Sequence, residues 1–164
     1  MKKIAFFTTI FALVLLLSAG VCQAQGGGAK QGPDVVRDPD MEKDSLHNLE
    51  VAREYFKLRK AYVASLQRCE EVLAGNPAFS KIDEVLYIAG TSSLNLAEAK
   101  GKQKPDRYVA YGEKKSTLTP QQFRDKARDY LSQLVNSYPQ SKFKDEALED
   151  LKSLGGAKPK QSAP

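Results

Sequence analysis

Few side chains in this chain of 164 residues could take part in catalysis. It has one histidine, His47, and two cysteines, Cys22 and Cys69. A nucleophile needs a neighbouring base, and a metal ion needs several ligands at a defined spacing; neither pattern is present. His47 lies among polar residues at the start of a predicted helix, so we interpret it as a solvated side chain. The sequence also lacks phosphate-binding loops, zinc-protease motifs and nucleophile elbows. It therefore predicts no catalytic residue, no cofactor and no metal site.

The positions of Cys69 and of the acidic pairs on the predicted helices account for these residues without a catalytic role. Cys69 shares a helical stripe with Leu66 and Leu73, which predicts a small buried core residue. The neighbouring carboxylates at 70–71 do not face each other on a helix, so no acid and base pair is expected there. Those at 145–146 lie in the first turn of a predicted helix, where the helix dipole favours negative charge.

The first 24 residues have the pattern of a secretory signal peptide. Two lysines precede an apolar run over 4–17, and small residues follow it up to Ala24. This run is shorter than the roughly 20 residues that a membrane-spanning helix needs, which favours removal over anchoring. We expect cleavage between Ala24 and Gln25, which makes 1–24 the signal peptide. The alternative is a lipoprotein in which Cys22 becomes the acylated terminus.

The charge of the chain does not point to a nucleic acid partner. Lys and Arg number 25 and Asp and Glu 20, a formal charge of +5, which falls to +3 when Lys2 and Lys3 leave with the signal peptide. Proteins that bind DNA or RNA cluster their cations, often with aromatic residues between them. Here both signs are mixed along the mature chain, so no nucleic acid partner is expected.

Hydrophobic periodicity predicts helices in the rest of the chain. Apolar residues recur at steps of three and four in five segments, and no segment shows the alternation of a strand. The clearest helix start combines Thr119 as the cap, Pro120 at the first helical position and Gln122 to complete a capping box. Pro77 and Pro139 are expected to end helices.

The predicted helices define the domain boundaries. We expect a flexible leader at 25–44, because it is rich in Gly and Pro. A helical domain follows at 45–155, with an insertion loop at 101–118. The basic, Pro-containing stretch at 156–164 has nothing to bury and is expected to be a disordered tail.

An internal repeat is the most informative feature of the sequence. Residues 65–77 match 127–139 in character, with Ser65 aligned to Ala127 and a proline at the end of each segment. A small residue twelve positions before the proline lets two antiparallel helices approach closely, and the proline ends the second helix. This arrangement is typical of tetratricopeptide-like helical hairpins. We expect an all-α fold of about two and a half such repeats, with five helices in a short right-handed solenoid.

The stretches 52–57, 71–87 and 134–143 indicate a family. The Tyr-Pro-x-Ser stretch at 138–141, followed by an acidic helix start, is the most recognisable piece. The chain resembles the BamD-like (outer membrane assembly lipoprotein) branch of the tetratricopeptide-repeat superfamily, and it is similar to the C-terminal repeat domain of the Tol-Pal-associated cell division coordinator. The resemblance covers roughly 46–154. It implies export to the bacterial periplasm or the periplasmic face of the outer membrane, with envelope proteins or peptide segments as partners, outer membrane assembly components among them.

The repeat register predicts a partner-binding groove on the first helix of each hairpin. The residues expected to line it are Glu50, Glu54, Lys57, Leu58, Tyr87, Thr91, Leu94 and Asn95.

The insertion at 101–118 has a composition of its own. It contains five Lys or Arg residues, two tyrosines and two acids. With Arg107 beside them, Tyr108 and Tyr111 could anchor the loop on an acidic protein, anionic lipid headgroups or glycan. The favoured alternative is a plain mobile loop.

These observations favour a non-catalytic scaffold of the cell envelope that binds a protein or peptide in a tetratricopeptide-like groove, with outer membrane protein assembly as one setting. Two alternatives stay open: a secreted enzyme, and an accessory subunit of another envelope complex of the Tol-Pal type. Contact with a membrane is expected only if Cys22 is acylated, or through the partner.

Overall fold

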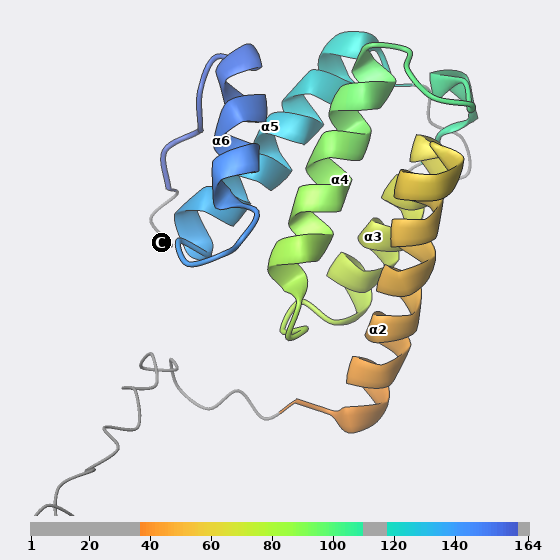
Figure 1. Ribbon diagram of the computed structural model, residues 1–164, viewed down its shortest axis with the longest axis vertical. Helices are drawn as coiled ribbons and strands as arrows, with labels where there is room; N and C mark the ends of the chain where they lie inside the picture. The colour runs from red at the N-terminus through yellow and green to blue at the C-terminus, as the bar shows by residue number, and fades with distance from the viewer. Residues whose placement is uncertain (1–36, 110–117, 161–164) are drawn as a thin grey trace, which may run out of the picture. The chain divides into compact units, whose positions relative to one another are not determined.

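The computed structural model describes residues 37–109 and 118–160, whose regular structure is entirely helical. Five α-helices follow one another, with a π-helical stretch after the first and a short 3-10 turn before the fourth (Figure 1). The bounds are α2 (Pro39–Arg53), η1 (Glu54–Arg59), α3 (Tyr62–Gly75), α4 (Ile82–Ala97), η2 (Pro105–Arg107), α5 (Pro120–Ser137) and α6 (Lys144–Ser153). The predicted all-α class is therefore confirmed for the described residues.

Several predicted features lie outside the described residues. These are the signal peptide, Cys22, the cleavage site between Ala24 and Gln25, most of the leader, Tyr111 and the stretch 161–164. The contacts of the chain also separate residues 1–35 from the rest, and the description below concerns the second unit alone.

The first helix begins earlier than predicted, so residues 39–44 are not part of a flexible leader. Asp38 caps α2 by accepting hydrogen bonds from the backbone N–H groups of Asp40 (2.8 Å) and Met41 (3.3 Å), and Pro39 occupies the first helical position. Both are strong signals for a helix start. The first turn is also fixed from outside the helix, because the Glu42 carboxylate accepts a hydrogen bond from the backbone N–H of Ser80 (3.1 Å).

The predicted helix boundaries around the two prolines are confirmed. α3 ends at Gly75, two residues before Pro77, and α5 ends at Ser137, two residues before Pro139. The capping box of Thr119 and Gln122 is present at the start of α5. Between α2 and α3 the chain turns at Lys60, which adopts a left-handed conformation with φ of 48°.

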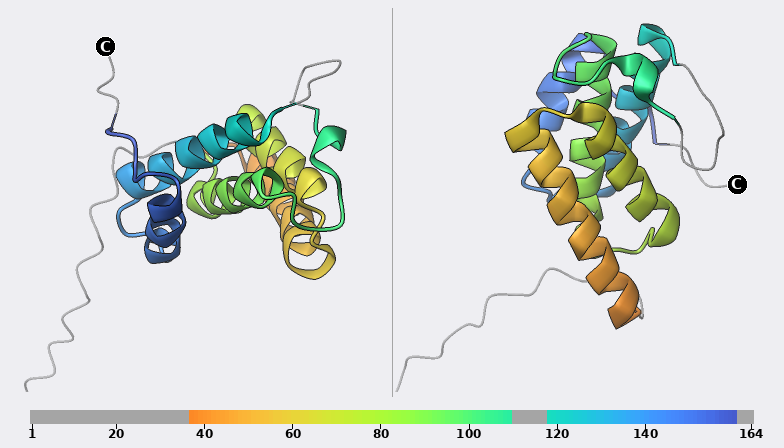
Figure 2. Two further views of the ribbon diagram at one scale, coloured as in Figure 1. Left: turned by 90° about the horizontal axis from the view of Figure 1, so that it is seen from above. Right: turned by 90° about the vertical axis from the view of Figure 1, so that its right-hand side faces the viewer.

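The helices form two layers, because each one runs back along the one before it. α2, α4 and α6 lie side by side in one layer, and α3 and α5 lie behind them (Figures 1 and 2). The buried side chains between the layers form two clusters. The largest fully buried side chains include Leu49, Leu66, Leu86, Leu96, Tyr108, Phe123, Leu131, Leu134 and Leu151.

Small residues allow the layers to approach closely at two equivalent places. The Ser65 hydroxyl of α3 donates a hydrogen bond to the backbone carbonyl of Ala52 in α2 (3.1 Å). In the next hairpin Gly90 of α4 lies against α5, where an added Cβ would be 2.6 Å from Cγ of Leu131 and 3.4 Å from the carbonyl oxygen of Ala127. Ser65 and Ala127 are the two small residues that the internal repeat aligns, so the prediction of a close approach at both is confirmed.

The first half of the insertion is packed rather than plainly mobile. The Gln103 side chain accepts a hydrogen bond from the backbone N–H of Ala64 (3.0 Å), and the Gln67 side chain donates one to the carbonyl of Val109 (3.1 Å). Tyr108 is fully buried. Tyr108 therefore belongs to the core, and residues 101–109 are held against α3 by these contacts.

The segment after α6 is also held in place, which corrects the prediction of disorder for residues 156–160. Arg128 and Asn136 of α5 donate side-chain hydrogen bonds to carbonyl groups of this segment. Its glycines, Gly155 and Gly156, have φ values of 84° and 87°, which allow the chain to turn back along α5. The composition of this segment offers little apolar surface to bury, and polar contacts with a distant helix cannot be predicted from composition.

Candidate functional site

The side chains of α2, α4 and α6 form a polar face on one side of the molecule, here called the α2–α4–α6 face. A bidentate ion pair joins α2 to α4: Arg53 Nε lies 2.6 Å from Glu84 Oε1, and Nη2 lies 2.7 Å from Oε2. Glu84 is nearly buried. Burial raises the pKa of its carboxyl, but the hydrogen bonds and the charge of Arg53 outweigh this, so the pKa lies below its usual value. The pair fixes α2 against α4.

A second set of contacts joins α4 to α6 on the same face. The Thr91 hydroxyl donates a hydrogen bond to Asp150 Oδ2 (3.0 Å), and the rings of Tyr87 and Phe143 stack with centroids 4.9 Å apart and an interplanar angle of 12°. Burial, followed by the negative charges of nearby glutamates, raises the pKa of Asp150. The carboxylates around it make this end of the face acidic.

Most of the predicted groove residues that the structure places lie on or beside this face. Tyr87 and Thr91 are part of the contacts to α6, and the Asn95 side chain donates a hydrogen bond to the Thr91 carbonyl one turn earlier (2.8 Å). Glu50 and Lys57 are close enough to the Arg53 and Glu84 pair to act on its charges.

The other three predicted groove residues, Glu54, Leu58 and Leu94, have different surroundings. Glu54 forms an ion pair with Arg59 within η1, away from α4. Leu58 is 77% exposed at the end of η1. Leu94 lies on the same side of α4 as Tyr87 and Thr91 but is only 8% exposed, so little of its side chain is open to a partner.

Sequence reasoning missed Arg53, Glu84 and Asp150. Charged residues at helical spacing usually form a solvated surface, and nothing in the local sequence distinguishes these three. For Arg53 and Glu84 the available signal was their position in the repeat register, within one turn of predicted groove residues, whereas no groove residue was predicted near Asp150 in the sequence. Their partners lie 31 and 59 positions away along the chain, beyond the range of a local pattern.

A second polar cluster lies where the insertion meets α3 and α5, and it corrects the role expected for Tyr108. The Tyr108 hydroxyl lies 2.8 and 2.9 Å from the two oxygens of Glu70, which share its single proton in a bifurcated hydrogen bond. Lys126 Nζ lies 2.6 Å from Glu70 Oε1, and the Tyr130 hydroxyl donates to the same oxygen (3.0 Å). Burial and then the charge of Glu70 raise the pKa of Tyr130. Because Tyr108 is buried in this cluster, it cannot serve as an anchor for a partner.

The other residues singled out from the sequence lie apart from both clusters. Arg107 is exposed on η2, and His47 is exposed on α2. Cys69 is buried in the core as predicted, and burial raises the pKa of its thiol. Across residues 37–109 and 118–160, no group of three or more His, Cys, Asp or Glu side chains is arranged to hold a metal ion.

Comparison of the chain with known protein families, with curated proteins and with solved structures gave no match. Among the helices that the structure describes, none has the length and apolar character needed to cross a membrane.

Proposed function

We propose that this protein is a non-catalytic scaffold of the bacterial cell envelope that binds an extended segment of a partner on the α2–α4–α6 face. The observation that carries the proposal is the difference between the two layers. Residues 101–109 and 155–160 pack against α3 and α5, whereas no described segment crosses the α2–α4–α6 face (Figure 1). Among the described residues, segments of the chain thus cover the layer of α3 and α5, and none covers the layer of α2, α4 and α6.

The contacts across this face suit it to binding a partner. Arg53 and Glu84 on one side and Thr91 and Asp150 on the other hold the three helices in register, so the surface is preorganised. A preorganised surface loses less conformational entropy when a ligand binds. Tyr87 lies half-buried between the two contacts and offers an aromatic surface.

We further propose that the helices are tetratricopeptide-like hairpins, about two and a half repeats in a right-handed array. Support comes from the two close approaches at Ser65 and Ala127, each followed by a helix end before a proline. This is the recurring geometry of a helical repeat. It agrees with the resemblance to the BamD-like branch and to the Tol-Pal-associated coordinator.

Export follows from the signal sequence, and its test is the mature terminus. We expect intact-mass spectrometry of the protein from the bacterial envelope to give a chain that begins at Gln25. A mass that begins at an acylated Cys22 would place the protein on the membrane as a lipoprotein. Recovery of the uncleaved chain from the cytoplasm would contradict the envelope role.

Charge reversal on the α2–α4–α6 face tests the binding role. Glu50 and Glu146 are exposed on α2 and α6, and they act on Arg53 and Tyr87 of this face, so Glu50→Arg with Glu146→Arg changes the face while the buried core of the fold is retained. We expect the wild-type protein to capture a defined envelope protein from periplasmic extract and the double variant to lose it. Asp125→Arg reverses an exposed charge on α5, outside this face, and this variant should retain the partner. Capture that both proteins keep, or that Asp125→Arg also loses, would contradict binding on this face.

A further inference from the structure

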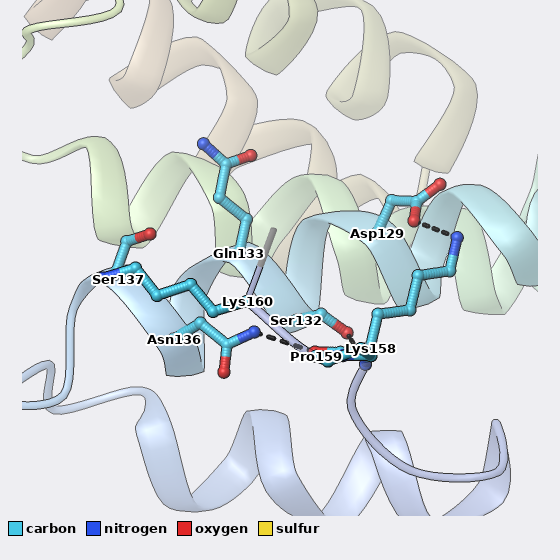
Figure 3. Close-up of a pocket in the computed structure, with 8 residues that line it drawn as sticks. All are labelled: Asp129, Ser132, Gln133, Asn136, Ser137, Lys158, Pro159 and Lys160. Carbon is cyan, nitrogen blue, oxygen red and sulfur yellow. Dashed lines mark hydrogen bonds and ion pairs between the residues drawn. The ribbon is translucent and has the colours of Figure 1, made fainter. Parts of the chain in front are cut away.

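One side of α5 binds a stretch of main chain through a row of polar side chains. Arg128, Ser132 and Asn136 are four residues apart and so lie on one side of the helix. Arg128 Nε donates to the carbonyl of Gly156 (2.7 Å), and Asn136 Nδ2 donates to the carbonyl of Lys158 (2.9 Å). The Ser132 hydroxyl accepts from the backbone N–H of Lys158 (2.8 Å) (Figure 3). The row thus recognises a backbone rather than side chains.

Only one side chain of the bound segment is recognised by charge. The Lys158 ammonium forms an ion pair with the Asp129 carboxylate on the same side of α5 (Figure 3). The residues before Lys158 are Gly155, Gly156 and Ala157, which have little or no side chain to pack. The recognised pattern is therefore a lysine that follows small residues, with a turn of the chain at Gly155 and Gly156.

The contact is polar and stays open to solvent. A hollow of about 540 Å³ lies between α5 and the segment. It is lined by Asp129, Ser132, Gln133, Asn136, Ser137, Lys158, Pro159 and Lys160 (Figure 3). None of these is a large apolar residue, so the segment can leave without exposing core side chains to water.

We propose that this row on α5 is a second binding site, for a lysine-containing segment of a partner protein, and that residues 155–160 occupy it in cis. The partner segment is expected to have the same pattern as residues 155–160, namely small residues followed by a lysine that lies opposite Asp129. The site is independent of the α2–α4–α6 face. A tethered occupant acts at a high effective concentration, in the millimolar range for a short linker. The partner therefore binds weakly until the cis segment is released.

The test uses the full chain and a blocked, fluorescently labelled hexapeptide, Gly-Gly-Ala-Lys-Pro-Lys, with binding followed by fluorescence anisotropy. Lys158→Glu places a second carboxylate beside Asp129 and should release the cis segment. We expect this variant to bind the peptide at least tenfold more tightly than wild type. Lys43→Glu, at an exposed position of α2 away from this site, changes the net charge equally and should bind within about twofold of wild type.

Two further variants locate the site. In the Lys158→Glu background, Asp129→Asn and Asn136→Ala each remove one contact to the segment, and each should weaken peptide binding several-fold. A peptide with glutamate in place of its first lysine should bind more weakly than the original. Circular dichroism checks that the variants keep their helical content.

Three outcomes would overturn the proposal. The first is the absence of peptide binding to the Lys158→Glu variant. The second is binding that Asp129→Asn and Asn136→Ala leave unchanged. The third is binding that is lost with the Glu50→Arg and Glu146→Arg double variant, since the peptide would then lie on the other face. The capture of an envelope protein, which Glu50→Arg with Glu146→Arg should abolish, tests the proposed function separately, and its outcome does not depend on the peptide measurements.

Discussion

Glu70 connects three segments that are far apart in the sequence. Its carboxylate is bound by Tyr108 of the insertion and by Lys126 and Tyr130 of α5. Removing one member of a nearly buried ion pair leaves the other charge without compensation, which is strongly destabilising. We expect Glu70→Gln to lower the free energy of unfolding by about 2 kcal/mol, somewhat less than for a fully buried pair because Lys126 keeps some contact with water. Urea denaturation measures this change.

The adjacent Glu71 provides a matched control for Glu70. Glu71 forms an ion pair with Arg68 one turn away, where both side chains are partly exposed to solvent. Exposed pairs of this kind contribute about 0.5 kcal/mol or less, so Glu71→Gln should leave the urea midpoint almost unchanged. Equal losses for the two variants would show that the buried cluster does not hold the insertion in place.

Glu84 gives the stability of the protein a defined pH dependence. Its folded-state pKa is below the usual value because Arg53 stabilises the carboxylate, whereas in the unfolded chain the pKa is ordinary. The stabilisation is present above the unfolded pKa and is lost as the pH falls through the folded one. In urea titrations from pH 7 to pH 3, the stability difference between wild type and Glu84→Gln should therefore shrink below about pH 4. A difference independent of pH would contradict the role given to this pair.

At the scale of the helices, Gly90 sets how closely α4 approaches α5. A Cβ at this position would lie 2.6 Å from Cγ and 2.7 Å from Cδ2 of Leu131, a buried side chain with little room to move. Overpacking of this kind costs about 1–3 kcal/mol, and better helix propensity returns up to about 1 kcal/mol. We expect Gly90→Ala to lower the melting temperature. Gly75→Ala, with no atom within 4 Å of the new Cβ, should not lower it.

The helices could be predicted where the signal is local. Thr119 with Gln122, and the prolines at 77 and 139, mark boundaries that depend only on neighbouring residues. The start of α2 carried the same type of signal at Asp38 and Pro39, but the glycines before it led to the prediction of a leader.

The features that were missed depend on contacts between distant residues. Nothing near Tyr108 indicates that its partner Glu70 lies 38 positions away, so an aromatic residue in a basic loop was interpreted as an anchor for a partner. The contacts of Lys158 with α5 span 22, 26 and 29 positions and were missed for the same reason. On the α2–α4–α6 face, the repeat register predicted Tyr87 and Thr91 as groove residues, and the charged residues beside them depend on pairing between helices, which the register does not show.

For the helical unit as a whole, the question is whether the hairpins unfold together. The two buried clusters share residues at their border, namely Leu73, Tyr87, Tyr130 and Tyr138. Shared packing couples neighbouring repeats, whereas weak interfaces let an array unfold in parts. We therefore predict one cooperative transition for the described helices.

Substitutions at opposite ends test this cooperativity. Leu66 of α3 and Leu151 of α6 are fully or almost fully buried, one in each cluster. Each Leu→Ala change should cost about 2–5 kcal/mol, a large part of the 5–15 kcal/mol typical of a domain. Hydrogen exchange should then show that Leu151→Ala reduces protection in α2 and α3 as much as in α5. Reduced protection confined to α5 and α6 would instead mean that each hairpin has a stability of its own. In that case a partner that binds across the α2–α4–α6 face would contact all the hairpins and add to the stability of the whole array.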